Sequence, residues 1–429
     1  MRGRTGLLTS LMLVVVSCAP EPAPVSTPIQ QPAPVKNPRV ERVTTAVPFP
    51  RGLQLVDGDL YVLARGRVRE SGGVSGDIDD KAGTIYKVDP EIAEPIASYD
   101  ISSKVRTNGE VFAAPTSPPF KLFDRTANPP TRDRETDRPY CSLRYDAATK
   151  SFYVCAFSGI DKAAQGKGST FSKNTADAVF RFDTRTDKWY EVERHSLEAG
   201  GNYPHQDPAA AKPPHGRLNG PDNCLVVGRW LYCVAKDNSL LARYDLEEIA
   251  KNPDAGPPQS HWVLDDKINI KGRGVMSLQG HSMLAYRGDG YLYIGYRTSS
   301  AIVRIPLDSG GLPKQPIVGE MLAQFDPYDP ATRTSANLTD MVFGPDGSLY
   351  VVSAQPSRIY RFIPDAANVF DGRTGQSPAW ADMAQLTGNA KMKSENVLVD
   401  DGGRLYVTSG DAYDFQNGAG GVVYRVTPQ

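Results

Sequence analysis

The chain has 429 residues, of which 48 are basic, 49 acidic and 40% hydrophobic, and it contains 39 glycines and 35 prolines. This length can bury a large core, while the many polar and charged residues exclude a polytopic membrane protein. The near-zero net charge and the lack of a basic stripe in the sequence argue against a protein that binds nucleic acid.

The first eighteen residues have the pattern of a bacterial lipoprotein signal peptide. Arg2 and Arg4 precede an apolar segment, residues 7–16, that is too short for a stable membrane anchor. The segment ends in Val-Val-Ser-Cys, which resembles a lipobox and implies cleavage after residue 17 and acylation of Cys18, with palmitate as one of the chains. An ordinary secretory signal with a chance cysteine is the alternative.

Residues 18–39 are rich in proline and show no apolar periodicity. We expect an extended tether of about 3 Å per residue between the membrane and a globular domain at 40–429. Ala19 follows the cysteine where an aspartate would retain the protein at the inner membrane. We therefore expect an extracytoplasmic protein of the bacterial cell envelope, in the periplasm or at the cell surface. Cys18 would anchor it in a lipid bilayer, which is the outer membrane if the host has one.

Four further cysteines bracket two segments that have the pattern strand, turn, strand. Cys224 and Cys233 flank a tight turn that places them opposite each other, and Cys141 and Cys155 flank a longer one. The two pairs predict cross-strand disulfides, which fit an oxidising compartment. A metal site is the rival interpretation, although neither pair has the CxxC spacing that zinc usually requires.

Two short patterns recur six times along the chain. The first, of the type LYV, follows a tight turn and a short apolar segment, and it begins at positions 60, 152, 231, 292, 349 and 405. The second places one basic residue among apolar neighbours, an alternation typical of a half-buried strand. We expect these basic residues to be structural, with stems on the blade surface and heads reaching water or acidic partners. They are Lys87, Arg181, Arg243, Arg304, Arg361 and Arg425.

Repeats of about 40–50 residues with four strands each indicate a β-propeller. Fourth strands are predicted at 96–101, 188–194, 261–266 and 321–325. The last unit ends without a fourth strand, and residues 40–49 can supply one, which would close the ring without an exposed edge. The predicted fold is thus all-β, a six-bladed propeller closed by an N-terminal strand. An open arrangement and a seventh blade within 103–139 are the alternatives.

The connections between second and third strands are longest in the first, second and last units, which are neighbours on a closed ring. These loops are 65–83, 158–177 and 410–421, and long connections between units at 103–139 and 196–219 lie on the same face. Long polar loops on a rigid scaffold commonly carry binding, so they predict a binding wall on one face. Solvated decoration is the alternative.

Polar residues stand where the inner strands begin, near the predicted axis. Their carboxylate and amide oxygens suit Ca²⁺ or Mg²⁺, and a carboxylate beside a bound metal can activate water. Alternatively, these residues cap strand ends and bond each other. The candidate catalytic residues are Glu395, Asp340 and His281, and the candidate ligand-binding residues are Asn219, Asp222, Asn223, Asn337 and Asn396. His281 aligns with an apolar residue of the next unit, so a packing role is equally open.

Residues 337–362 and 395–426 resemble blades of the NHL-repeat and gluconolactonase-like propeller superfamily. They share the order apolar strand, turn of the PDG type, LYV, and then a basic residue between apolar ones. The resemblance covers nearly all of the mature chain and indicates a scaffold rather than an activity. It implies a divalent metal in the central channel, with Glu395, Asn223 and Asp340 at the places of its ligands.

Two classes of function follow. The first is an envelope-anchored propeller that binds a small ligand or an envelope protein through its loop-rich face and channel mouth. The second is a hydrolase or lyase that depends on Ca²⁺ or Mg²⁺ in the central channel, so whether the protein is an enzyme stays open. The sequence contains no serine nucleophile elbow, phosphate-binding loop or dinucleotide fingerprint.

Overall fold

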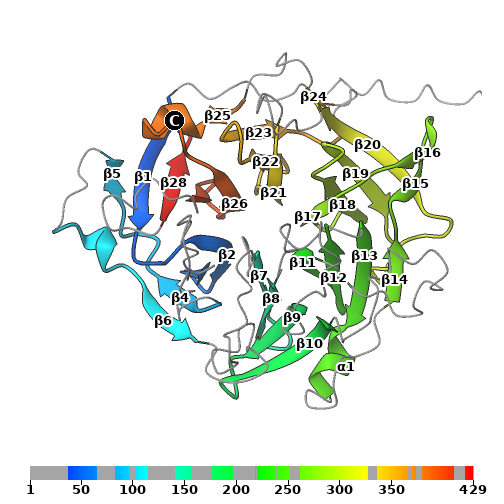
Figure 1. The fold of residues 1–429 in the computed structure, drawn as a ribbon, viewed down its shortest axis with the longest axis horizontal. Helices are drawn as coiled ribbons and strands as arrows, with labels where there is room; N and C mark the ends of the chain where they lie inside the picture. The colour runs from blue at the N-terminus through cyan, green and yellow to red at the C-terminus, as the bar shows by residue number, and fades with distance from the viewer. Residues whose placement is uncertain are drawn as a thin grey trace, which may run out of the picture.

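Six antiparallel sheets surround a common centre as the blades of a ring (Figure 1). This computed structural model describes residues 37–64, 83–96, 102–114, 141–156, 176–196, 218, 220–236, 239–251, 261–326, 336–365, 370–372, 379–409 and 421–428. The predicted all-β, six-bladed propeller is confirmed. The signal peptide, Cys18 and nearly all of the tether lie outside the described residues.

Each blade consists of four antiparallel strands that pair in order from the centre outward. Blade 1 contains β2 (Pro50–Val56), β3 (Asp59–Ala64), β4 (Ile85–Val88) and β6 (Glu110–Ala113). Blade 2 contains β7 (Ser142–Asp146), β8 (Ser151–Ala156), β9 (Ala176–Asp183) and β10 (Lys188–Ser196). Blade 3 contains β11 (Pro221–Val227), β12 (Trp230–Ala235), β13 (Leu240–Asp245) and β14 (His261–Leu264).

The second half of the ring repeats this order. Blade 4 contains β17 (His281–Ala285), β18 (Tyr291–Tyr296), β19 (Ala301–Pro306) and β20 (Val318–Phe325). Blade 5 contains β21 (Leu338–Phe343), β22 (Leu349–Ser353), β23 (Arg358–Phe362) and β25 (Ala381–Asp382). Blade 6 contains β26 (Ser394–Val399), β27 (Leu405–Ser409), β28 (Val422–Thr427) and, from the other end of the chain, β1 (Arg39–Thr44).

A few short elements extend the outer rim. Blade 4 is widened by β15 (Lys267–Ile270), β16 (Gly274–Ser277) and β24 (Phe370–Gly372), and blade 6 by β5 (Glu94–Pro95). The helical elements are η2 (Lys104–Arg106), α1 (Leu246–Lys251) and α2 (Met383–Thr387). In the part of the chain that the structure describes, no helix has the length and apolar character to cross a membrane.

The two ends of the chain close the ring in blade 6. Strand β1 pairs antiparallel with β28, and Val40 lies opposite Val426. The buried Glu41 carboxylate accepts a hydrogen bond from Arg425, with 2.8 Å between its Oε2 and the Arg425 Nη2. The prediction that an N-terminal segment supplies the missing strand is therefore confirmed, and the pairing hides the edge that β28 would otherwise expose.

Three of the four predicted fourth strands are confirmed, as β10, β14 and β20. The prediction of 96–101 as the fourth strand of blade 1 is wrong, because β6 pairs with β4 in that place. The residues that precede β6 contact blade 6 instead of blade 1. The Asn108 amide donates to the Val43 carbonyl of β1 at 2.7 Å, and β5 pairs with β1. Nearly all residues of the three enlarged loops predicted to form a binding wall lie outside the described residues, as does 115–139 of the predicted connection 103–139.

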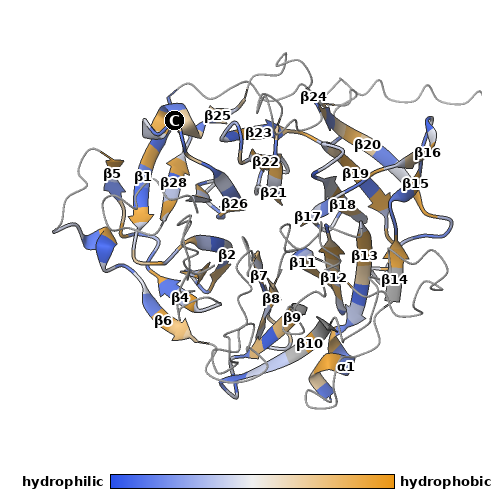
Figure 2. Cartoon of the chain, in the orientation of Figure 1, coloured by the Kyte–Doolittle hydropathy of each residue, from blue (hydrophilic) through white to orange (hydrophobic). Residues whose placement is uncertain are grey.

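The recurring sequence patterns form one cross-strand pair in every blade. The aromatic residue of the LYV pattern lies opposite the basic residue of the third strand, in the pairs Tyr61–Lys87, Tyr153–Arg181, Tyr232–Arg243, Tyr293–Arg304, Tyr350–Arg361 and Tyr406–Arg425. The cationic heads then reach acidic or aromatic partners, such as Glu320 for Arg304 at 2.9 Å. The predicted structural role of these basic residues is therefore confirmed. Around them, apolar segments follow the strands of all blades (Figure 2).

The predicted disulfides are wrong, since no disulfide joins the four described cysteines, all of which are buried. Cys224 does lie opposite Cys233, but Cβ atoms of such pairs are about 4.5–5.5 Å apart, at or beyond the upper limit for a disulfide. Cys155 lies opposite Ser142, so Cys141 points to the other face of the sheet. Burial also raises the pKa of the Cys155 thiol well above its ordinary value, which leaves it unreactive.

Candidate functional site: a ring of polar residues at the channel axis

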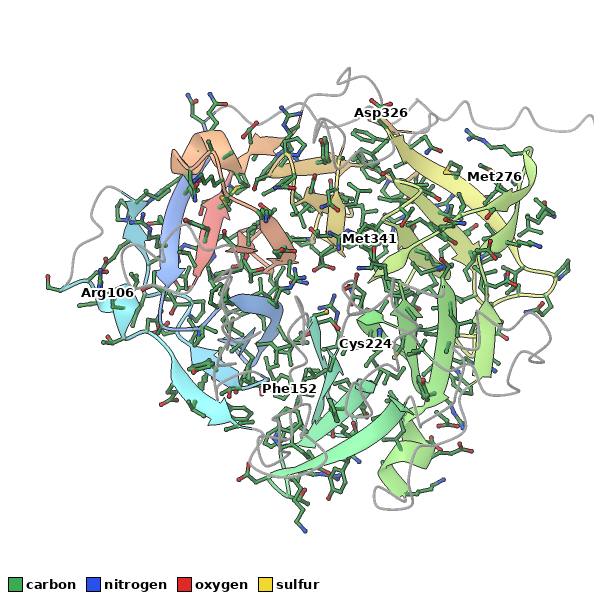
Figure 3. All side chains as sticks on the ribbon, viewed as in Figure 1. Arg106, Phe152, Cys224, Met276, Asp326 and Met341 are labelled. Carbon is green, nitrogen blue, oxygen red and sulfur yellow. The ribbon has the colours of Figure 1, made fainter. Side chains whose placement is uncertain are left out.

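The inner strands form a closed ring in the order β2, β7, β11, β17, β21 and β26, with β26 again next to β2. In Figure 3, Met341 of β21 and Cys224 of β11 lie near the centre, while Arg106, Met276 and Asp326 lie on the outer rim. All inner strands begin at the same end of this ring. Side chains from their first residues can therefore meet although the sequence separates them widely.

Five of the six inner strands have an irregular register at their start. The shifts lie between Pro50 and Leu53, Pro221 and Asn223, His281 and Met283, Leu338 and Asp340, and Ser394 and Val397. An extra residue of this kind bends the strand and re-aims the neighbouring side chain. The same device, repeated from blade to blade, turns polar residues toward the axis.

Asp340 is the centre of a hydrogen-bond network that joins four blades. Its Oδ1 accepts from the Asn223 amide at 3.0 Å, and its Oδ2 accepts from the Asn396 amide at 3.2 Å and from the Val397 backbone at 3.2 Å. Arg144 donates to the Asn223 Oδ1 at 3.2 Å and lies 3.7 Å from the Asp340 carboxylate. Burial raises the pKa of Asp340, and the Arg144 charge opposes that shift.

Glu395 forms a second, adjacent group with Arg51. The Arg51 guanidinium donates to the Glu395 carboxylate, and the two side chains are only 4% and 3% exposed. Burial alone would lower the pKa of Arg51, but Glu395, the Cys141 thiol and Asp222 outweigh it and raise that pKa. The pair thus remains charged inside the ring, and Asp222 contributes a third negative charge nearby.

Two of the predicted site residues take no part in the Asp340 and Glu395 contacts, and a third is not among the described residues. Asn337 accepts a hydrogen bond from the Arg297 Nε at 2.7 Å and links blades 4 and 5. His281 packs on the Tyr296 ring with 4.5 Å between ring centroids. Asn219 lies outside the described residues. The catalytic and ligand-binding roles of all these residues remain predictions.

His281 is fully buried, and neither of its ring nitrogens has a hydrogen-bond partner. Burial lowers the pKa of His281 to about 3, so the imidazole is neutral at physiological pH. A neutral imidazole with this pKa is a weak base, and it offers one donor and one acceptor to a ligand.

The buried imidazole predicts a pH dependence that a His281→Phe variant should remove. The folded-state pKa lies below the unfolded value, so between about pH 6.5 and 3 the unfolded chain binds a proton that the folded chain does not. Stability from this source is complete above that window and is lost as the pH falls through it. We expect the variant to recover of the order of 4 kcal/mol of this loss by pH 3. Urea unfolding at stepped pH measures it, and identical slopes for both chains would contradict the prediction.

The residues expected to hold a divalent metal do not fit one in this arrangement. The acceptor positions of Asp340 are taken by amides, a backbone N–H and Arg144, and Glu395 is taken by Arg51. The predicted ligands thus bind one another and two guanidinium groups, and they do not point to one common position where a metal ion could bind. Within the described residues, no group of three His, Cys, Asp or Glu could hold a metal ion.

The sequence interpretation missed Arg144 and did not assign a role to Arg51. Arg144 stands opposite Tyr153, where three other inner strands have Leu225, Val342 and Leu398. This position is apolar in those three strands. A charged residue there was the signal in the sequence that Arg144 belongs to the polar ring at the axis. Arg51 precedes Gly52, whose missing side chain is required because a Cβ there would lie 2.5 Å from the Leu143 nitrogen.

Several polar atoms of the inner-strand starts are buried and have no hydrogen-bond partner in the part of the chain that the structure describes. They are the Arg51 Nε, both His281 ring nitrogens, the Ser282 Oγ and the Asn396 Oδ1. Donors and acceptors are both represented, and they come from blades 1, 4 and 6. We call these four residues the axial polar set.

No protein-family model and no curated protein matches the chain. Solved structures do match over most of its length. The PQQ-bound aldose sugar dehydrogenase of Streptomyces coelicolor has 14% identity and a TM-score of 0.47, covering 92% of this chain and 99% of its own. A gluconolactonase of Xanthomonas campestris has 13% identity and a TM-score of 0.41, covering 94% and 99%.

Regucalcin of Agrobacterium tumefaciens, described as a calcium-binding protein, has 10% identity and a TM-score of 0.44, covering 91% of this chain and 95% of its own. Structural neighbours of the gluconolactonase-like type are thus found, in keeping with the resemblance of the repeats. Identities of this size transfer no activity. In its fold, the chain is similar to gluconolactonase-like six-bladed propellers.

Proposed function

We propose that this protein is an envelope-anchored recognition propeller that binds a small polar ligand at the start of its inner strands. The observation that supports it is the axial polar set. A buried polar group without a partner costs about 1–3 kcal/mol, so buried polar groups are nearly always satisfied. Four such residues at one end of one ring favour a site whose partners arrive with a ligand, because local rules are most often broken at functional sites.

The charges of the ring limit the chemistry of the ligand. Arg51 is offset by Glu395 and Arg144 by Asp340, and His281 is neutral. The ring therefore has no strong unbalanced charge except at the half-exposed Asp222. We propose a ligand that donates and accepts hydrogen bonds, rather than a multiply charged one. The metal-dependent hydrolase is the weaker candidate, because its expected ligands are already engaged.

A thermal-shift screen against polar small molecules tests the binding proposal. We expect at least one compound to raise the melting temperature of the wild-type protein and to lose that effect in His281→Phe. Ser282→Ala should weaken the same response. Ser348→Ala is the matched control and should keep it, because this serine lies at the turn between β21 and β22, where its hydroxyl donates to Asp346. If compounds stabilise wild type and His281→Phe equally, the ligand does not bind here, and if none acts, a protein partner becomes the better account.

The envelope location is a separate part of the proposal and is supported by the leader sequence alone. Cys18→Ser should prevent acylation, because the thiol is the acceptor of the lipid. We expect the wild-type protein to remain in the membrane fraction and to incorporate labelled palmitate. The variant should move to the soluble fraction without label. A wild-type protein that is soluble and unlabelled in a lipoprotein-processing bacterium would overturn the anchor.

A further inference from the structure

Two carboxylates at the axis each lie beside a guanidinium group of the chain. Glu395 is paired with Arg51, and Asp340 lies beside Arg144. Asp222 acts on the Arg51 charge as well. Of the two cations, Arg51 is the more deeply buried, because its side chain is 4% exposed and that of Arg144 is 14% exposed. Glu395 depends on Arg51 for its charge balance, since a buried carboxylate without a counter-charge is strongly unfavourable.

Two consecutive residues at the start of β26 carry side-chain oxygens, and one of them, Glu395, accepts a hydrogen bond from Arg51. Glu395 and Asn396 are consecutive residues of the irregular start of β26, and the Asn396 Oδ1 is buried without a partner. The Asn396 amide donates to the Cys141 carbonyl at 3.4 Å, which brings the start of blade 2 to the same place. Carboxylate and amide oxygens are ligands that Ca²⁺ prefers, with water completing a coordination of about 6–8 oxygens.

We propose that Arg51 is the resident cation of this channel, that it excludes divalent ions from Glu395, and that its removal opens a divalent-cation site on the side-chain oxygens of Glu395 and Asn396. The proposal concerns the same ring as the proposed binding function and rests on it only in that shared location. It makes Arg51 the residue that determines whether the channel takes a metal. Arg144 has no such role, because Asp340 keeps three hydrogen bonds from Asn223, Asn396 and Val397 without it.

The test is thermal unfolding of metal-free protein with CaCl₂, MgCl₂ or MnCl₂ at millimolar concentrations and without any organic ligand. We expect no response from the wild-type protein. Arg51→Ala should melt about 5–10 °C lower, since it removes the positive charge bonded to the buried Glu395, and Ca²⁺ should recover at least half of that loss. Calorimetry should then give one bound ion per chain.

Three further variants separate a metal site from general stabilisation. Arg51→Ala with Glu395→Gln removes both charges and should not respond to Ca²⁺. Arg51→Lys retains a cation and should behave as wild type. Arg144→Met, the matched control from the neighbouring blade, should lose stability without gaining a response. If Arg51→Ala unfolds in buffer, refolding with and without CaCl₂ gives the same comparison.

The proposal is overturned if folded Arg51→Ala binds none of the three ions, or if the wild-type protein binds one stoichiometrically at Glu395. Neither result depends on the ligand screen, which uses chains that retain Arg51. Failure of this proposal therefore leaves the proposed binding function intact, and failure of the screen leaves this proposal intact.

Discussion

A chain that lacks β1, residues 39–44, is expected to lose cooperative folding. This strand closes blade 6, and its Val43 is fully buried in a core that also contains Tyr406 and Val423. Its loss would expose the β28 edge, leave Arg425 without Glu41, and open the contact between the first and last blades. Because a ring is closed or open as a whole, we expect the effect to spread beyond blade 6.

Circular dichroism, thermal unfolding and size-exclusion chromatography measure this effect. The control is a chain that begins at Asn37, which removes the leader and tether but keeps β1. We expect the control to be monomeric with one sharp transition. The truncated chain should aggregate or unfold broadly. A truncated chain that melts within about 2 °C of the control would show that β1 contributes less than about 1 kcal/mol and that closure is not needed.

Replacement of Arg181 by methionine should destabilise the fold by about 3–5 kcal/mol, as expected when one partner of a buried ion pair is removed. The Arg181 side chain is 1% exposed, and its Nη2 lies 2.7 Å from the Asp183 Oδ2. Its Nε donates to the Ser151 Oγ at 2.9 Å, and its Nη1 donates to the Ile249 carbonyl at 3.5 Å, which ties blade 2 to α1. Methionine fills part of the volume but satisfies none of these groups.

Arg185 supplies the matched control for this prediction. It contacts the same Asp183 carboxylate at 2.9 Å, but its side chain is 57% exposed. An exposed ion pair contributes little, so Arg185→Met should cost less than about 1 kcal/mol. Urea unfolding of both variants gives the comparison. Similar losses for the two would mean that burial does not govern the strength of this cluster.

The six-bladed ring could be predicted from the sequence because each blade repeats the same two strand patterns. The tyrosine of each second strand and the basic residue of each third strand recur in register, and the structure pairs them in all six blades. The fourth strand of blade 1 was harder to place than those of blades 2, 3 and 4, which were predicted correctly at β10, β14 and β20. In blade 1, β6 has only four residues, and the segment predicted for its role begins where β5 joins another blade.

The candidate site was predictable in position but not in its bonding. Asn223, Asp340 and Asn396 were expected to converge, and they share one network. What they bind depends on Arg144, whose only signal in the sequence is a charge at a position that is apolar in three other inner strands. The disulfides failed for a similar reason: separation along the chain predicts which cysteines are opposite, but bond formation depends on the distance between Cβ atoms.

The most direct test of this account is a high-resolution crystal structure of the wild-type protein grown with millimolar CaCl₂. The central claim is that guanidinium groups of the chain itself, and not a metal, balance the carboxylates at the axis. We expect the Arg51 guanidinium against Glu395, and Asp340 bonded to the amides of Asn223 and Asn396. A calcium ion bound by Glu395, Asn223 and Asp340, with Arg51 turned away, would contradict the claim.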